Sequence, residues 1–395
     1  MGREFRTVGV VGAGTMGSGI AQLALEAGAD VWLHDLAEAA LAGAADRIRD
    51  GLRRRATRLG LEAAAIDDWV DGHLARLRCG TALGEFVGGT DLVIEAAIED
   101  LSAKQAIFAA LDAATPTGTA LATNTSALSV TAIASATRRP SQVVGLHFFN
   151  PAPVMRLVEV VATLASDPAL VDDLARLMGR WGRVAVRSAD APGFIVNRVN
   201  RPFTLEPLAA LEAGATGAAD MDSAFRDAGY PMGPFELMDL IGLDVNLAVT
   251  RALHAAATAA GDPLADRFRP SGLQERLVEQ GRLGRKTGAG FYGPDERAAR
   301  RLGDPTHKAG ARAIAVVERV ELAIIDEAYR AVGERIATTT DVDTALRLGA
   351  GHPLGPFERV EQLGGPAEVL ARLRGIADHD PRFAPAPALV AAADR

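Results

Sequence analysis

A glycine-rich turn near the start of the chain sets the strongest limit on its fold. Residues 7–11 have the apolar pattern of a buried parallel strand, and Gly12-Ala-Gly-Thr-Met-Gly17 follows at once. Residues 18–27 favour a helix, residues 31–34 give a second strand pattern, and Asp35 comes directly after it. A strand, Gly-x-Gly-x-x-Gly, a helix, a strand and an acid in this order are typical of a dinucleotide-binding unit.

Each residue of this turn has its own expected role toward a dinucleotide. Gly12 makes the tight turn, Gly14 lets the backbone approach the pyrophosphate, and Gly17 lets helix and strand pack closely. The N-terminus of the helix then faces the phosphates. Asp35 lies 18 residues after Gly17, where a carboxylate binds ribose hydroxyls and repels a 2′-phosphate, so NAD is favoured over NADP. The cofactor-binding residues expected here are Gly12, Gly14, Thr15, Met16, Gly17 and Asp35.

Strand and helix patterns continue to alternate through the first half of the chain. Residues 90–97 and 120–123 indicate further inner strands, with a helix over residues 102–113 between them. In an open parallel sheet, ligands bind just beyond the carboxyl ends of the strands. Asn124 and Ser126 also fit as ordinary caps of the next helix. The polar residues expected at these two strand ends are Glu99, Lys104, Asn124 and Ser126.

Two short strand patterns, over residues 143–149 and 155–161, each carry one polar residue in an apolar row. An Asn-Pro-Ala-Pro turn separates them, because proline cannot continue a strand ladder. Glu159 needs a partner in such a row, and His147 on the neighbouring strand is the nearest titratable candidate. A histidine held by a carboxylate is the arrangement of a general base. The alternative is a structural histidine, with Glu159 on an edge strand facing water.

A basic helical hairpin is expected at about residues 40–78. Its first helix carries six arginines, which are Arg47, Arg49, Arg53, Arg54, Arg55 and Arg58. One interpretation is a solvated helix face. The other is a clamp for a phosphorylated substrate, because guanidinium groups bind phosphate through paired hydrogen bonds.

Composition narrows the class of protein further. The chain has 395 residues, enough for more than one domain, and a net charge of −8, which argues against nucleic acid as a partner. A single cysteine agrees with a reducing compartment. No apolar run reaches the ~18–20 residues of a membrane span, the start lacks a secretory signal, and no metal-ligand cluster stands out. We therefore expect a cytoplasmic protein without a metal.

The second half contains helix patterns only, and it is internally repeated. Blocks of Pro-x-Gly-Pro-Phe-Glu begin 122 residues apart, at Pro231 and Pro353, which indicates a duplication. A long helix is expected to begin at Phe194, with Asn197 near its first turn. The sequence thus predicts an α/β Rossmann-type domain followed by an all-α C-terminal region of two related helical domains. The expected domains are 1–188, 189–295 (the first copy) and 307–395 (the second copy).

These motifs together resemble the 3-hydroxyacyl-CoA dehydrogenase family, in the 3-hydroxybutyryl-CoA dehydrogenase-like form with a duplicated helical domain. The matching stretches are 12–21, 124–129, 145–151, 157–159 and 190–198. The resemblance implies that His147 is catalytic with Glu159 as its partner. It also implies that Ser126 contacts the 3-oxygen of the substrate and that Asn197 binds its carbonyl region. The positions expected on the cofactor side are Glu99, Lys104 and Asn124.

The family resemblance implies reversible oxidation of (S)-3-hydroxyacyl-CoA to 3-oxoacyl-CoA by NAD, as in fatty-acid or aromatic-acid beta-oxidation. The basic hairpin, with Arg54 and Arg58, matches the region that holds the CoA adenosine phosphate. Two alternatives stay open: a dehydrogenase of a free hydroxy acid such as gulonate or carnitine, and a catalytically idle NAD-binding protein. Single-copy members of the family are dimers through the helical domain, so the resemblance leaves open a homodimer. It also leaves open an association with other beta-oxidation enzymes.

Overall fold

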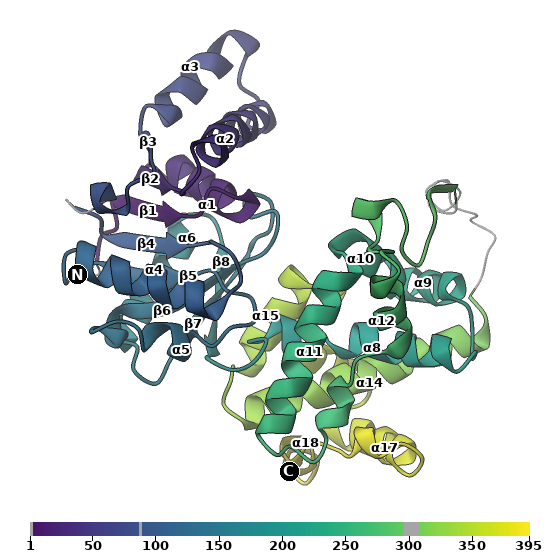
Figure 1. Cartoon of the computed structure of the whole chain (residues 1–395). Coiled ribbons are helices and arrows are strands. Elements are labelled where there is room, and N and C mark those ends of the chain that lie inside the picture. Colours follow the sequence, from purple (N-terminus) through teal and green to yellow (C-terminus); the bar gives the residue numbers. More distant parts are fainter. Residues whose placement is uncertain (1–2, 87–88, 296–308) are drawn as a thin grey trace. The chain divides into compact units, whose positions relative to one another are not determined.

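A mostly parallel sheet organises the first half of the chain, as its alternating patterns predict (Figure 1). The computed structural model describes residues 3–86, 89–295 and 309–395. Within them, eight strands lie in the order β3-β2-β1-β4-β5-β6-β7-β8, and of the neighbouring pairs only β6 and β7 run antiparallel. The order reverses beside β1, which makes the cleft at β1 and β4 the expected ligand position. The strands are β1 (Thr7–Val11), β2 (Asp30–His34), β3 (Leu77–Gly80), β4 (Leu92–Glu95), β5 (Ala120–Thr123), β6 (Val143–Phe148), β7 (Leu157–Ala162) and β8 (Val184–Ala189).

Helices cover both faces of this sheet. Side chains alternate along each strand, so in β4 Leu92 and Ile94 enter one apolar core and Val93 enters the other. The first core is closed by α1 (Thr15–Glu26), α2 (Glu38–Arg58) and α6 (Pro168–Arg180). The second is closed by α4 (Leu101–Ala114) and α5 (Val130–Ala134). The α/β Rossmann-type prediction for this part is confirmed.

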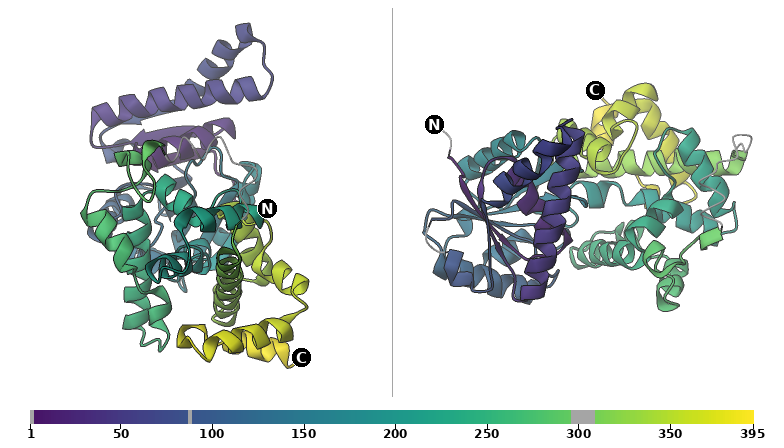
Figure 2. Two further views of the ribbon diagram at one scale, coloured as in Figure 1. Left: turned by 90° about the vertical axis from the view of Figure 1, so that its right-hand side faces the viewer. Right: turned by 90° about the horizontal axis from the view of Figure 1, so that it is seen from above.

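The basic hairpin is present, but it is shorter than the sequence predicts. It consists of α2 and α3 (Ala63–Leu74), which lie side by side in Figures 1 and 2. The hairpin is expected to extend to about residue 78, whereas residues 77–80 form β3 and pair with β2. Each residue of β3 is exposed or only half-buried, so this edge strand lacks the apolar run by which buried strands are recognised.

The rest of the described chain is helical, as predicted. The chain divides into two compact units, Met1–Phe194 and Ile195–Arg395. The first copy, predicted to begin at residue 189, belongs to the second unit from Ile195 onward, as does the described part of the second copy. The predicted start of the second copy, residue 307, lies outside the described residues. The helices of this unit are α7 (Val196–Val199), α8 (Pro202–Glu212), α9 (Ala218–Asp227), α10 (Pro234–Ile241), α11 (Leu243–Ala259), α12 (Gly272–Glu279), α14 (Ala311–Gly333), α15 (Thr339–Gly349), α16 (Pro356–Gln362), α17 (Pro366–Ala377) and α18 (Pro387–Ala393).

The long helix expected from Phe194 is two helices in the structure. The chain forms α7, then tighter turns in which the amides of Arg201 and Phe203 bond to carbonyls three residues back, and then α8. Pro202 explains the break, because proline has no N–H to donate and is favoured at the first turn of a new helix. The matching segment of the second copy has no proline and forms the continuous helix α14.

The two copies fold alike around their repeated blocks. The Oδ1 atom of Asp222 accepts a hydrogen bond from the amide of Phe235 at 3.0 Å, and Oδ1 of Asp343 accepts one from the amide of Phe357 at 2.8 Å. In both copies the block begins a helix, α10 or α16, with a glycine N-cap and proline in the first turn. The repeat in the sequence therefore corresponds to a repeat in local structure.

The copies also touch each other through equivalent residues. A Cβ atom added to Gly229 would lie 3.4 Å from Cβ of Pro353, and one added to Gly351 would lie 3.1 Å from Cγ of Pro231. Such a reciprocal contact, in which i meets j and j meets i, defines an isologous interface. The two copies are thus related by an approximate two-fold axis within one chain.

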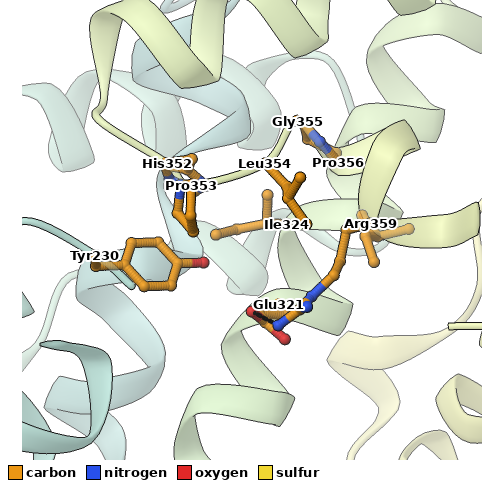
Figure 3. Close-up of a pocket in the computed structure, with 10 residues that line it drawn as sticks. Tyr230, Glu321, Ile324, His352, Pro353, Leu354, Gly355, Pro356 and Arg359 are labelled. Carbon is orange, nitrogen blue, oxygen red and sulfur yellow. Dashed lines mark hydrogen bonds and ion pairs between the residues drawn. The ribbon is translucent and has the colours of Figure 1, made fainter. Parts of the chain in front are cut away.

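Tyr230 and His352 meet at this axis, each directly before the proline of its block (Figure 3). Their ring centroids are 5.0 Å apart in an edge-to-face arrangement. His352 Nε2 lies 2.7 Å from Oδ1 of Asn200, and burial lowers the pKa of His352 to about 3. The imidazole is therefore neutral at physiological pH and serves as a packing residue.

Candidate active site

The glycine turn has the space that a dinucleotide needs. Gly12 has φ +102°, and a Cβ there would lie 2.6 Å from the carbonyl oxygen of Ala96. A Cβ at Gly17 would lie 1.7 Å from the carbonyl oxygen of Gly12, so both positions require glycine. A Cβ at Gly14 would meet nothing within 4 Å, which leaves the backbone open to a pyrophosphate at the N-terminus of α1. The glycine turn therefore has room for the pyrophosphate of NAD.

Asp35 and Arg47 hold the turn from outside. The Oδ2 atom of Asp35 accepts a hydrogen bond from the amide of Ala13 at 2.8 Å. Arg47, on α2, donates to the carbonyl of Ala13 at 2.6 Å and to Oγ of Ser18 at 3.1 Å. The sequence did not predict these contacts, which make one arginine of the hairpin a structural partner of the glycine turn. The binding of ribose by Asp35 stays a prediction.

His147 and Glu159 face each other on adjacent strands, as the strand patterns predict. They form a directly opposed pair of β6 and β7, and Nδ1 of His147 lies 2.6 Å from Oε2 of Glu159. Glu159 is fully buried, and β7 lies between β6 and β8. The alternative of an edge-strand glutamate facing water is therefore wrong. The rings of Phe149 and Phe194 lie 4.5 and 5.8 Å from the imidazole, so the pair sits in an apolar setting.

The hydrogen bond to Glu159 determines which nitrogen of His147 is basic. A carboxylate accepts, so Nδ1 carries the proton in the neutral ring and Nε2 keeps its lone pair. An imidazole held in this way accepts a proton at Nε2, and the carboxylate behind it compensates the positive charge that then appears.

Glu99 and Asn124 organise the loops next to this pair. Oε1 of Glu99 accepts hydrogen bonds from Oγ1 of Thr125 at 2.7 Å and from the amide of Ser126 at 2.8 Å. Oδ1 of Asn124 accepts from the amide of Phe148 at 2.8 Å. The polar residues predicted at the ends of β4 and β5 are thus brought together. Their contacts with a cofactor stay a prediction.

Lys104 is buried in an ion pair that the sequence did not predict. Its Nζ lies 2.6 Å from Oε1 of Glu95 and 3.4 Å from Oε2 of Glu99, and only 1% of its side chain is exposed. Glu95 is fully buried and also accepts a hydrogen bond from Oγ1 of Thr123 at 2.7 Å. A glutamate at the end of an apolar strand, with a lysine nine residues later, was the available signal.

We expect Lys104→Met to destabilise the first unit by about 3–5 kcal/mol, because it leaves the buried Glu95 carboxylate without its cation. Urea unfolding followed by tryptophan fluorescence measures this loss in the full chain. Tryptophan fluorescence reports on the first unit alone, because all three tryptophans lie in that unit, at Trp32, Trp69 and Trp181.

The matched control is Arg6→Met, which breaks an exposed ion pair with Glu4 in the same unit. Such a pair contributes at most about 1 kcal/mol. The double variant Lys104→Met/Glu95→Gln should recover part of the stability, since it removes both buried charges. Equal losses for Lys104→Met and Arg6→Met would contradict the prediction.

Three further residues, Arg54, Arg58 and Asn197, are predicted to bind the substrate. Arg54 and Arg58 are exposed on α2, one turn apart, and Nε of Arg58 donates to the carbonyl of Arg54 at 3.2 Å. In the described ranges neither forms an ion pair, whereas Arg53 pairs with Asp67 at 2.6 Å. Asn197 is half-buried on α7 in the second unit, and its role toward substrate stays a prediction.

No helix among residues 3–86, 89–295 and 309–395 has the length and apolar character to cross a membrane. Within the same ranges, no group of three or more His, Cys, Asp or Glu side chains is arranged to hold a metal ion.

Comparisons with known proteins identify the family of the chain. The family "3-hydroxyacyl-CoA dehydrogenase, NAD binding domain" matches residues 7–191, and "3-hydroxyacyl-CoA dehydrogenase, C-terminal domain" matches residues 193–293 and 316–391. The chain is 47% identical over 296 residues to the 3-hydroxyadipyl-CoA dehydrogenase of Escherichia coli, covering 75% of this chain and 60% of that protein. It is 41% identical over 287 residues to the mitochondrial hydroxyacyl-coenzyme A dehydrogenase of Rattus norvegicus, covering 72% of this chain and 90% of the rat protein.

Among solved structures, the 3-hydroxybutyryl-CoA dehydrogenase of Escherichia coli superimposes with a TM-score of 0.87 at 35% identity, covering 99% of this chain and 98% of the other. The matches extend over the NAD-binding unit and over both copies of the helical domain. The chain therefore belongs to the 3-hydroxyacyl-CoA dehydrogenase family.

Proposed function

We propose that the protein catalyses the reversible NAD-dependent oxidation of a (S)-3-hydroxyacyl-CoA to the 3-oxoacyl-CoA. The observation that carries this proposal is the buried His147–Glu159 pair, 2.6 Å apart, in the same sheet as a glycine turn that fits NAD. Names of the relatives support the substrate class, since all of the matches cited above are named for hydroxyacyl thioesters.

In the proposed mechanism, Nε2 of His147 removes the proton from the 3-hydroxyl group. Glu159 fixes the ring and stabilises the imidazolium that forms. The glycine turn at Gly12, Gly14 and Gly17 would hold NAD, which would supply the acceptor for the hydride on C3 as the alcohol becomes a carbonyl. Ser126 and Asn197 hold the oxygen as its charge changes, which is a preorganised dipole role. In the reverse direction the imidazolium returns its proton to the oxygen.

The test is oxidation of NADH with acetoacetyl-CoA, run beside the CoA-free acid acetoacetate and beside NADPH. We expect rapid turnover with NADH and the thioester only, because Asp35 disfavours a 2′-phosphate. Turnover of the free acid alone would indicate the hydroxy-acid alternative. NAD binding without turnover of any thioester would indicate the idle alternative.

We further propose that Arg54 and Arg58 bind a phosphate group of CoA. They are exposed, lie one turn apart on α2 and form no ion pair in the described part of the chain. We expect Arg54→Ala/Arg58→Ala to raise KM for acetoacetyl-CoA by about tenfold, which corresponds to about 1.4 kcal/mol of lost charge-assisted hydrogen bonding. The KM for acetoacetyl-pantetheine, which lacks these phosphates, should stay unchanged.

The matched control is Arg53→Ala/Arg55→Ala on the same helix. These arginines pair with Asp67 at 2.6 Å and Glu26 at 3.6 Å, so their charges are already compensated within the protein. A KM increase of the same size in this control would show that only the overall charge of the helix matters. The solvated-face interpretation would then hold.

A further inference from the structure

The helix that carries Asn197 is too short to stabilise itself. α7 has four residues, Val196–Val199, and no side-chain cap, and Pro202 prevents it from continuing as one helix with α8. A single turn gains too few hydrogen bonds to offset the cost of nucleation. Contacts with other elements, among them α14 and α15 of the same unit, therefore help to fix its position.

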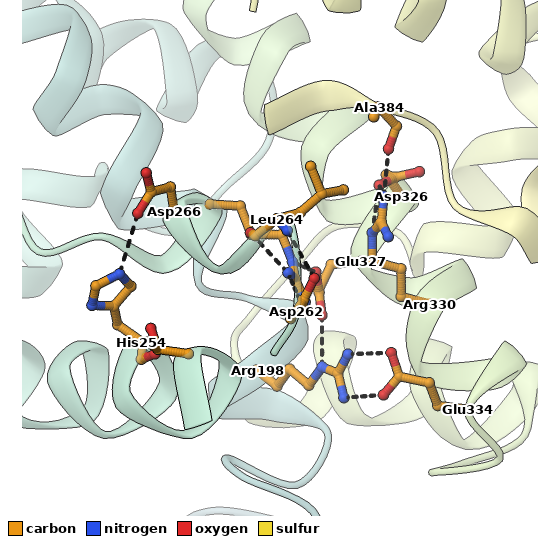
Figure 4. A network of polar contacts seen from close by, with 12 residues as sticks. Arg198, His254, Asp262, Leu264, Asp266, Asp326, Glu327, Arg330, Glu334 and Ala384 are labelled. Carbon is orange, nitrogen blue, oxygen red and sulfur yellow. Dashed lines mark hydrogen bonds and ion pairs between the residues drawn. The ribbon is translucent and has the colours of Figure 1, made fainter. Parts of the chain in front are cut away.

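Arg198, next to Asn197, provides some of these contacts, and the carboxylates bonded to its guanidinium group in the described chain lie on or just after α14 of the second copy (Figure 4). Its Nε donates to Oε1 of Glu327 at 2.6 Å. Its Nη1 and Nη2 donate to the two carboxylate oxygens of Glu334 at 2.7 and 2.8 Å. The guanidinium is buried, so these charge-assisted bonds are protected from water.

Glu327 is itself held in place. It is 2% exposed, and its second oxygen accepts a hydrogen bond from Nε of Arg267 at 2.7 Å. Arg267 also pairs with Asp262 and donates to the carbonyl of Leu264 (Figure 4). Arg198 is thus tied to a network that spans both copies.

The approximate two-fold axis produces a second, equivalent network. Arg319 and Glu206 are the counterparts of Arg198 and Glu327, at the separation of 121 residues that also relates Asp222 to Asp343. Nε of Arg319 donates to Oε2 of Glu206 at 2.7 Å, and Arg382 binds the same carboxylate at 3.0 Å. Here, however, the arginine lies within the 23-residue helix α14, which is continuous.

We propose that Glu327 and Glu334 are positioning residues, through which the second copy fixes α7 and thereby Asn197 for substrate. The proposal rests on the function proposed above, in which Asn197 holds the substrate oxygen. The second copy would then have a role in activity, which is to hold α7 in place. Glu334 has no acidic counterpart in the first copy, where Ala213 stands at the same separation, and its carboxylate binds both Nη atoms of Arg198.

The test compares Glu327→Gln with Glu206→Gln in the full chain. Each variant neutralises a buried carboxylate that binds two arginines, so both should lower Tm by similar amounts. We expect Glu327→Gln to reduce kcat/KM for acetoacetyl-CoA by about tenfold or more, because small misplacements of a positioning group are costly. Glu206→Gln should stay within about twofold of the wild type. The Kd of NADH should not change in either variant, because the NAD-binding residues all lie in the first unit.

A double-mutant cycle then shows whether Glu327 acts through Asn197. If it does, Glu327→Gln costs nothing further in an Asn197→Ala background, because the group that it positions is already absent. Full additivity would overturn the proposal, and so would equal activity losses in Glu327→Gln and Glu206→Gln, which would mark a purely structural role.

Hydrogen exchange gives a readout that does not depend on catalysis. The amides of Val199 and Asn200 donate to the carbonyls of Ile195 and Val196 within α7. We expect these amides to exchange faster in Glu327→Gln and in Glu334→Gln, and not in Glu206→Gln. Unchanged exchange would overturn the positioning role even in an active enzyme. If the amides exchange faster in these variants but the wild type turns over no thioester, the positioning role stands and the proposed function is wrong.

Discussion

Replacement of His147 by glutamine is expected to reduce turnover of acetoacetyl-CoA by about 1,000-fold, the usual contribution of a positioned acid–base group. Glutamine retains an amide N–H that can donate to Glu159, so the buried carboxylate keeps a partner and the fold is spared. The measurement is steady-state oxidation of NADH by the thioester at saturating concentrations.

Binding of NADH provides the control for His147→Gln. The glycine turn expected to bind the cofactor lies between β1 and α1, whereas His147 lies on β6. The Kd of NADH should therefore stay within about twofold of the wild type. A loss of turnover that comes with an equal loss of NADH binding would indicate general damage to the sheet. Retention of normal turnover would exclude His147 as the base.

Replacement of Glu159 by glutamine is expected to reduce kcat by about 100-fold, with little change in KM. The neutral amide fills the same space on β7, but it no longer compensates the charge of the imidazolium. It also presents an N–H that can turn toward Nδ1 and favour the other tautomer, in which Nε2 is protonated and cannot act as a base. The same NADH assay, run across thioester concentrations, separates kcat from KM.

The double variant His147→Gln/Glu159→Gln tests whether the two residues form one catalytic unit. Effects of residues that act together are strongly non-additive. The double variant should therefore be no slower than His147→Gln alone. If the two losses multiply, Glu159 contributes by a route other than His147.

Several parts of this protein could be predicted because they depend on local sequence. The glycine turn has a fixed order of strand, glycines and helix, and Gly12 and Gly17 admit no side chain. The His147–Glu159 pair could be found because side chains alternate along a strand, so a polar residue in an apolar row is visible in the sequence. The repeated blocks were visible for a similar reason, since identical local motifs recur at Pro231 and Pro353.

The features that were missed depend on which residues meet in three dimensions. β3 is an edge strand with half-exposed residues, so no apolar run indicates it. The pairing of Lys104 with Glu95 requires the N-terminal part of α4 to lie against the end of β4, which a helix pattern does not specify. Arg47 looked like its neighbours in the basic helix, yet it alone among them bonds to the glycine turn in the described chain. The break before α8 is different, because Pro202 is a signal in the sequence itself, and the prediction of one long helix from Phe194 overlooked it.

The approximate two-fold axis between the copies has a consequence for how this protein can evolve. In a dimer of identical chains, one codon specifies a residue on both sides of the axis, so each substitution changes two contacts at once. Joining the two copies in one chain gives each side its own codon. Glu334 can then bind Arg198 while Ala213 occupies the corresponding place, an asymmetry that two identical subunits could not encode. The two copies within one chain can therefore differ at positions that a dimer of identical chains would keep the same.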